Sequence, residues 1–131
     1  MENIIEVLRT CDDFSAGKGA STEQIDAASK ALGLDFAEDY MSYLQEFGLA
    51  FVNGHELTGI GIIPRNDVVS VTLEKRNLPH VNPVPEDWYV IEDTNIDNII
   101  IWQSTKGSIY MESPGAIKQI CNSMAEYILQ G

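Results

Sequence analysis

Apolar residues recur at helical spacing shortly after the start of the chain. Three of them fall on one face of a predicted helix: Ile25, Ala28 and Leu32. Ser21 and Gln24 stand at the first and fourth positions of a capping box, so each side chain can satisfy a backbone group of the other. Gly33 follows the last apolar position and permits the left-handed conformation that ends many helices. The pattern therefore predicts a helix between residues 21 and 33.

A second helical pattern follows at once. Its apolar positions repeat at i, i+3, i+4 and i+7, namely Tyr40, Tyr43, Leu44 and Phe47. Asp35 is predicted to cap this helix and Gly48 to end it. Both apolar faces require burial, and the strand-like segments downstream are the only available surfaces.

The pattern shortens to strand-like runs after Gly48. Residues 49–52 predict a strand, Asn53-Gly54 predicts a tight turn, and residues 57–63 predict a second strand. Gly59 and Gly61 interrupt this strand and permit a bulge or a close approach of another backbone segment.

Residues 66–78 carry two competing signals. Their β-branched residues favour a strand, whereas a cap at Asn66 or Asp67 and the cations Lys75 and Arg76 near the end favour a helix. We predict a helix here. Residues 79–86 contain Pro79, Pro83 and Pro85 and predict an extended loop.

Strand signals return in the last third of the chain. Residues 88–92 and 98–103 predict two strands joined by a polar turn at 93–97. Residues 99–102 lack alternation, which predicts a central strand covered on both faces. A turn at Lys106-Gly107 leads into a strand at 108–111, and Ser113-Pro114 is predicted to open a final helix. The apolar stripe predicted for this helix is Ile117, Ile120, Cys121, Met124 and Ile128, with Tyr127 beside it.

The start of the chain completes the picture. Residues 1–10 predict a short amphipathic helix and residues 11–20 a loop from which Phe14 reaches the core. We predict a single α+β domain over residues 1–131, with helices packed on a mainly antiparallel mixed sheet. Residues 1–20 form its N-terminal helix and loop, and residues 21–130 form its core.

Short motifs in this order resemble the SUKH superfamily. They are Leu32-Gly33-Leu34, Glu38-Asp39-Tyr40, Glu46-Phe47-Gly48 and Glu56-Leu57-Thr58-Gly59-Ile60. Members usually carry Leu-Pro before the Asp-Tyr pair, where this chain has Phe36-Ala37. The resemblance covers roughly residues 20–129 and implies a SUKH-like fold with a helix at 66–78.

Charge is the strongest compositional feature. Eight Lys and Arg against twenty Asp and Glu give a net charge of −12. Direct binding to nucleic acid or to an anionic membrane depends on cationic side chains, so neither is expected. A basic protein partner would be attracted, although plain solubility explains an acidic composition equally well. The pattern favours no particular oligomeric state.

No motif predicts catalysis, a metal or a cofactor. His55 and His80 are isolated and are predicted to be loop residues, and no nucleophile elbow or nucleotide-binding glycine motif is present. The acids at 87–97 lack the spacing of an EF-hand calcium loop. Cys121 is predicted to be a small core residue and Cys11 to lie near a flexible start. Because no catalytic motif is found, we expect that the protein is not an enzyme. Residues 1–20 lack the features of a signal peptide, so we expect a soluble cytoplasmic protein.

The distribution of acids suggests where a partner binds. No Lys or Arg occurs between Lys30 and Arg65 or between Arg76 and Lys106, while acids are frequent in both tracts. If the segments 48–63 and 88–103 pair in one sheet, the acids converge on one negative surface; otherwise each decorates its own solvated face. Strand alternation predicts that Trp88 or Tyr89 faces outward as an apolar anchor. The predicted partner-binding residues are Glu56, Asp87, Trp88, Tyr89, Glu92, Asp93 and Asp97.

The resemblance implies two functions. Many SUKH proteins are immunity proteins that neutralise a cognate secreted toxin, often a nuclease, in the bacterial cytosol. A nuclease presents a cationic surface, which an anionic protein can cover. The alternative is an intracellular signalling or scaffold domain that resembles the yeast regulators of cell-wall synthesis. The toxin-binding role is the first hypothesis.

Overall fold

The structure is a computed structural model that describes residues 3–61, 63–78 and 83–130. The helices of this part of the chain are α1 (Ile4–Thr10), α2 (Thr22–Leu32), α3 (Glu38–Phe47), the 3-10 turn η1 (Pro64–Asn66), α4 (Val68–Arg76) and α5 (Met124–Gln130). The strands are β1 (Phe14–Ala16), β2 (Ala50–Val52), β3 (His55–Glu56), β4 (Trp88–Asp93), β5 (Ile100–Ser104), β6 (Ile109–Ser113) and β7 (Ala116–Cys121). None of these helices has the length and apolar character needed to cross a lipid bilayer.

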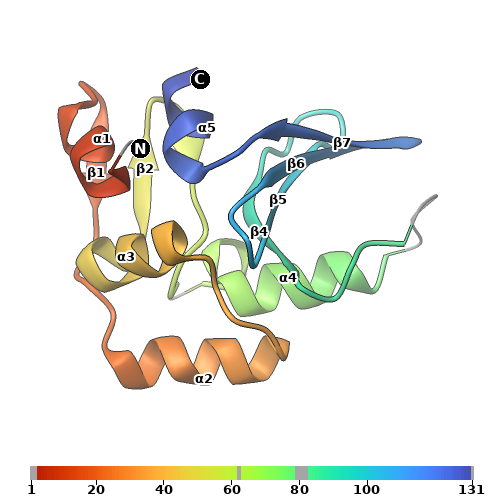
Figure 1. The fold of residues 1–131 in the computed structure, drawn as a ribbon, viewed down its shortest axis with the longest axis horizontal. Helices are drawn as coiled ribbons and strands as arrows, with labels where there is room; N and C mark the ends of the chain where they lie inside the picture. The colour runs from red at the N-terminus through yellow and green to blue at the C-terminus, as the bar shows by residue number, and fades with distance from the viewer. Residues whose placement is uncertain (1–2, 62, 79–82, 131) are drawn as a thin grey trace.

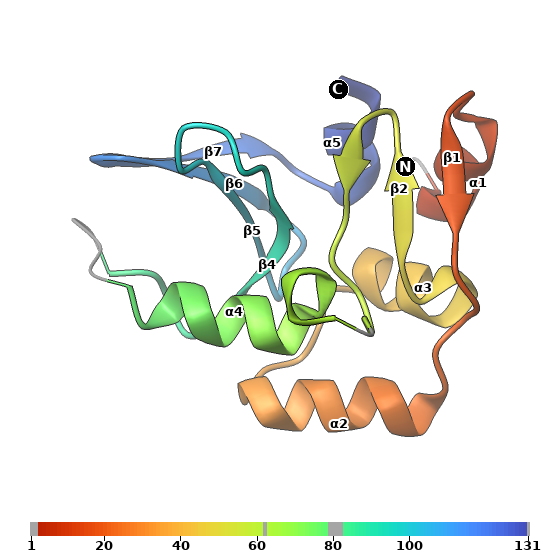
Figure 2. The same cartoon turned by 180° about the vertical axis from the view of Figure 1, so that it is seen from behind.

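Two antiparallel sheets organise the fold. One has the strand order β1-β2-β3 and the other the order β4-β5-β6-β7. The four-stranded sheet curls over α4, while α1, α5 and the three-stranded sheet gather at the opposite end of the molecule (Figures 1 and 2). The predicted α+β class with mainly antiparallel strands is confirmed, and the one parallel pairing among the described residues is an isolated bridge between Gly59 and Asp67.

The two helices predicted first are confirmed, with one change at a cap. Ser21 and Gln24 form both hydrogen bonds of a capping box, and Gly33 ends α2 in the left-handed conformation. Asp35, however, is not the cap of α3: the helix begins later, with Ala37 at the N-cap and no side-chain cap. The backbone N–H of Ala37 is instead bonded by the Tyr89 hydroxyl at 3.0 Å. Proline lacks this N–H, so a proline at position 37 could not form this bond.

The Asp-Tyr pair in the first turn of α3 has a structural role. Asp39 accepts hydrogen bonds from the Gln103 side chain at 2.9 Å and from the backbone N–H of Met124 at 2.8 Å. Tyr40 lies fully buried, and its hydroxyl is 2.8 Å from that of Thr58. The pair therefore connects α3 to β5, to the start of α5 and to the segment after β3.

The N-terminal segment contains more structure than predicted. The helix α1 is confirmed, but residues 11–20 are not only a loop, because β1 pairs antiparallel with β2. Phe14 packs edge-on against Phe47, with the ring centroids 5.1 Å apart. Because β1 and β2 are far apart in sequence, no local pattern could predict that they pair.

The predicted strand at 57–63 is also wrong over its described residues. Strand β3 is only His55–Glu56 and ends before Leu57. Residues after it run against Gly48: the N–H of Ile60 donates to the Gly48 carbonyl at 2.9 Å. A Cβ added to Gly59 would lie 2.0 Å from the same carbonyl oxygen. The two glycines shared with the SUKH motifs therefore allow two backbone segments to touch.

Replacement of Gly59 by alanine is expected to lower the free energy of unfolding by about 2 to 3 kcal/mol, because the clash falls on rigid backbone. Gly33→Asn is the matched control: nothing lies within 4 Å of a Cβ there, and asparagine tolerates the left-handed conformation. The control should cost less than about 1 kcal/mol in urea denaturation. Equal losses in the two variants would contradict the role given to the Gly48–Gly59 contact.

The helix predicted at 66–78 is confirmed as α4, and the side chain of Asp67 caps it by accepting from the N–H of Ser70. The predicted loop at 79–86 lies partly outside the described residues, since 79–82 are not described. His80 lies wholly outside them. The final helix is shorter than predicted. Ser113 and Pro114 open no helix; Ser113 pairs with Ala116 across a tight turn in which Gly115 has φ +85°.

This turn converts half of the predicted helix into a strand. Proline followed by a residue with positive φ is the pattern of a type II turn, and it joins β6 to β7. The predicted stripe is split, because Ile117, Ile120 and Cys121 lie on β7 while Met124 and Ile128 lie on α5. The helical prediction was wrong here because apolar residues of β7 and of α5 together happen to follow the spacing of one longer helix.

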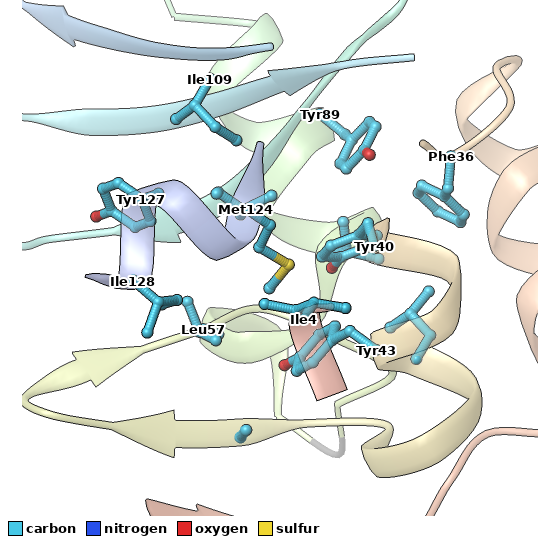
Figure 3. Packing of buried hydrophobic residues seen from close by; sticks show 14 of the residues in the cluster. Ile4, Phe36, Tyr40, Tyr43, Leu57, Tyr89, Ile109, Met124, Tyr127 and Ile128 are labelled. Carbon is cyan, nitrogen blue, oxygen red and sulfur yellow. The ribbon is translucent and has the colours of Figure 1, made fainter. Parts of the chain in front are cut away.

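The strands β4 and β5 are covered on both faces, as predicted for β5, whose residues are all buried. One face packs in the main core with Tyr89, Ile109, Met124, Tyr127 and Ile128 (Figure 3), where Cys121 is buried as predicted. The other face forms a second cluster under α4. That second cluster contains Val71, Trp88, Val90, Ile100 and Trp102.

Candidate functional site

A bulge in β4 decides which acids reach the surface. The pairing of β4 with β5 shifts register between Val90 and Glu92, so that Glu92 lies opposite Ile101 and Asp93 opposite Ile100. In regular alternation Glu92 would share a face with Val90. The bulge turns Glu92 toward the main core and Asp93 toward the face that carries Val90.

Glu92 is consequently an interior residue, 5% exposed. One of its carboxylate oxygens accepts from the Tyr127 hydroxyl and lies 2.8 Å from Nδ1 of His55. The rings of His55 and Tyr127 are also in contact, with centroids 5.2 Å apart. The three side chains come from β3, β4 and α5, and we call them the carboxylate latch. His55 is therefore a packed strand residue and not the loop residue predicted.

Asp93 borders a groove on the opposite face. This hollow of about 720 Å³ lies between the C-terminal end of α4 and the tip of the β6–β7 hairpin. Its apolar wall is formed by Leu78, Ile100 and Ile117, and its acids are Asp93, Asp97 and Glu112. We call it the acidic groove.

The register of the sheet builds the floor of the acidic groove. Asp93, Ile100, Glu112 and Ile117 face one another across four successive strands. Glu112 also accepts from the Trp102 indole N–H at 2.9 Å. Behind this row, Trp88 stacks on Tyr110 with ring centroids 4.0 Å apart and an interplanar angle of 18°. This stack lies in the second cluster, which Ile100 and Ile117 connect to the floor of the groove.

The two cations at the end of α4 are held at fixed positions. Lys75 lies 3.1 Å from Asp93 and 3.3 Å from Glu74. Partial burial opposes its charge, but the two carboxylates outweigh this effect and raise its pKa. Arg76 donates to the backbone carbonyls of Leu32 and Glu86, at 3.2 and 2.8 Å. Both cations therefore have structural contacts, and the groove carries more carboxylates than cations.

The turn that closes one side of the groove has unusual backbone geometry. Asn95, Asp97 and Asn98 all have positive φ, between 53° and 60°. Among residues other than glycine, a positive φ is uncommon and occurs most often at asparagine and aspartate. Asp93 stabilises the turn by accepting from the N–H of Asn95 at 3.1 Å. This conformation leaves Asp97 exposed on the rim and Ile96 64% exposed beside it.

The predicted partner-binding residues do not share one surface. Asp93 and Asp97 line the acidic groove, and Asp87 is exposed at the start of β4. Glu56 lies on the other sheet, 3.4 Å from Nε of Arg65. The segments 48–63 and 88–103 pair in separate sheets, so the predicted convergence of the two acidic tracts does not occur. The two sheets meet where Thr58 bonds the backbone of Val90 and Ile91.

The prediction that Trp88 or Tyr89 faces outward is wrong. The two side chains do point to opposite faces, but Trp88 is 8% exposed and Tyr89 is fully buried. The Tyr89 hydroxyl donates to Gln103 at 2.7 Å, and burial raises its pKa well above the usual value. Alternation alone fails here because both faces of the sheet are covered.

Two groove residues escaped prediction. The predicted strand at 108–111 stops before Glu112 and the predicted helix begins at Ser113, so the position of Glu112 opposite Ile100 was not foreseen. Lys75 was interpreted only as a cation at a helix end. A signal for Glu112 was available in Pro114-Gly115, which is typical of a hairpin turn as well as of a helix start.

No group of three or more His, Cys, Asp or Glu side chains among the described residues is placed to hold a metal ion. What the described surface offers is an acid-lined hollow with an apolar wall. That arrangement suits the binding of cationic and apolar side chains.

The helix pair, the touching glycines and the curled antiparallel sheet together define an α+β domain of the SUKH class. The chain belongs to the SMI1-KNR4 cell-wall family of this class (SUKH_5), whose family model matches residues 1–130. A search of curated proteins returned no match.

Proposed function

We propose that this protein is a non-catalytic immunity protein that binds and neutralises a basic, cognate secreted toxin in the bacterial cytosol. The observation that carries the proposal is the acidic groove, which combines a hollow of about 720 Å³ with three carboxylates and an apolar wall. Membership of the family and the net charge of −12 support it.

The chemistry of the groove suits a protein surface that evolved to hold nucleic acid. Such a surface presents Lys and Arg, which pair with carboxylates through charge-assisted hydrogen bonds. Asp97 is exposed and available for such contacts, and Asp87 is exposed at the other end of β4. Long-range attraction between the two proteins would accelerate association.

The remaining predicted residues contribute indirectly. Trp88 packs in the second cluster, to which Ile100 and Ile117 of the groove also belong. Tyr89 and Glu92 hold β4 to the main core. Glu56 is proposed as a peripheral contact, since its carboxylate is already close to Arg65.

The binding proposal predicts a strong salt dependence. Affinity for the cognate toxin domain should fall at least about tenfold between about 50 mM and 500 mM salt, because exposed charges are screened. Asp97→Asn, which keeps a residue suited to the positive φ of 53°, should weaken binding at low salt by about fivefold or more, measured by calorimetry. Asp26→Asn, on the exposed face of α2, is the matched control and should change affinity by less than about twofold. An affinity independent of salt would contradict the electrostatic mechanism.

A second candidate is a scaffold domain that regulates the cell's own proteins, which the cell-wall description of the family supports. The two candidates differ in partner. Capture of a secreted toxin domain by the purified protein supports the first, while association with host proteins in cells that lack any toxin gene supports the second.

A further inference from the structure

The outer strand of the four-stranded sheet is open on one side. β7 is the terminal strand in the order β4-β5-β6-β7 and pairs only with β6 among the described strands. Ala116, Lys118 and Gln119 are exposed. In Figures 1 and 2 the β6–β7 hairpin projects away from the helices. An exposed edge is a template for pairing with another extended chain.

This open edge borders the acidic groove. Residues 113–117, at the hairpin tip and the start of β7, form part of the groove wall. Ile117 lies opposite Glu112, and both face the groove. Since strands lie about 4.8 Å apart, a further strand beside β7 would run about 10 Å from Glu112. An extended arginine or lysine side chain can cover most of that distance.

The net charge of the chain indicates which kind of segment can pair with β7. A second copy would bring another net charge of −12 against the same edge, which opposes self-pairing. A basic segment would be attracted instead. Its alternate residues would face the groove, where Glu112, Asp93 and Asp97 lie.

We propose that a basic, extended segment of the partner adds to β7 as a fifth strand and directs cationic side chains into the acidic groove. This rests on the proposed function for the partner's basic character, but it adds the mode of recognition. Backbone hydrogen bonds along β7 supply the register, and the groove carboxylates supply the selectivity for cationic side chains.

Lys118 limits this edge. A lysine in the middle of an edge strand is a common protection against unwanted pairing. It also places the one cation of β7 beside the proposed basic segment. Its removal should therefore favour a basic strand over a neutral one.

The test uses synthetic peptides and the whole protein. The probe is a capped peptide of about eight residues that alternates valine and arginine. The control peptide has the same sequence and carries N-methyl groups on every second residue. N-methylation removes the N–H donors on one edge without changing charge. We expect the unmodified peptide to shift the backbone amide resonances of residues 116–121, and the methylated peptide to bind at least about tenfold more weakly.

Lys118→Glu should tighten binding of the unmodified peptide several-fold, while Lys30→Glu, an equal charge change on the exposed face of α2, should not. Equal binding of the methylated and unmodified peptides would overturn strand addition while leaving the electrostatic proposal intact. Absence of shifts in β7 would also overturn it. A dimer that pairs through β7, seen by sedimentation and blocked by Lys118→Glu, would show that the occupant is a second copy and would overturn the basic partner.

Salt-sensitive binding of the toxin domain tests the proposed function separately. If that binding is present and the peptide results are negative, only the strand-addition mode fails. If the peptides bind β7 and the toxin domain does not bind, the edge is real and the choice of toxin as partner fails.

Discussion

Glu92→Ala is expected to lower the free energy of unfolding by about 3 to 5 kcal/mol, because it removes a buried carboxylate that the side chains of His55 and Tyr127 share. The loss leaves the His55 ring and the Tyr127 hydroxyl without their shared acceptor, and it disconnects β3 and α5 from β4. Urea denaturation followed by circular dichroism measures it. Glu92→Gln keeps the shape and an acceptor oxygen, so it should cost clearly less than alanine.

The latch also makes stability depend on pH. The hydrogen bond with Glu92 raises the pKa of His55, against the opposing effect of partial burial. A raised pKa in the folded state means that this contribution is fully present below the unfolded pKa of about 6.5 and is lost as pH rises through the folded value. The stability difference between the wild type and His55→Gln should therefore be larger at about pH 5.5 than at about pH 9. A difference that grows toward alkaline pH would refute the latch as described.

Asp39→Ala is expected to cost about 3 to 4 kcal/mol, since it deprives a fully buried amide and a helix end of a charged acceptor. Gln103 is fully buried, and its amide donates both to Asp39 and to the Gly107 carbonyl, at 2.9 and 3.0 Å. The second oxygen of Asp39 accepts from Met124 at the start of α5. Thermal and urea unfolding both report the loss.

Glu38→Ala provides the control for Asp39, because Glu38 is the neighbouring acid and is exposed. Its cost should stay within about 0.5 kcal/mol, as for most surface changes. Comparable losses at the two positions would mean that the charge of the helix N-terminus matters more than the bonds to Gln103 and Met124.

The elements that could be predicted from sequence are those stabilised by near neighbours. The capping box of Ser21 and Gln24, the glycine ends of α2 and α3 and the cap of α4 at Asp67 all involve residues within four positions of one another. Periodicity then identified the buried faces of α2 and α3 correctly. The missed elements depend on distant partners: β1 requires β2, and β7 requires the hairpin at Pro114-Gly115.

The candidate site was only partly predictable for the same reason. Asp93 and Asp97 were named, and they do line the groove. Their neighbour Glu92 was named with them but is buried, since adjacent acids look alike in sequence and only the bulge separates their fates. Composition identified the sign of the surface, whereas strand register determined which carboxylates form it.

The β4 bulge has a consequence for which changes this strand can accept. Between Val90 and Asp93, the count of residues assigns one carboxylate to the interior and the next to the groove. A substitution of Glu92 acts on the carboxylate latch, whereas a substitution of Asp93 acts on its contacts with Lys75 and Asn95 and on the groove. A change of length by one residue in this strand would exchange the two carboxylates at once. Point changes on the groove side therefore leave the main core in place, while insertions and deletions here are constrained by folding.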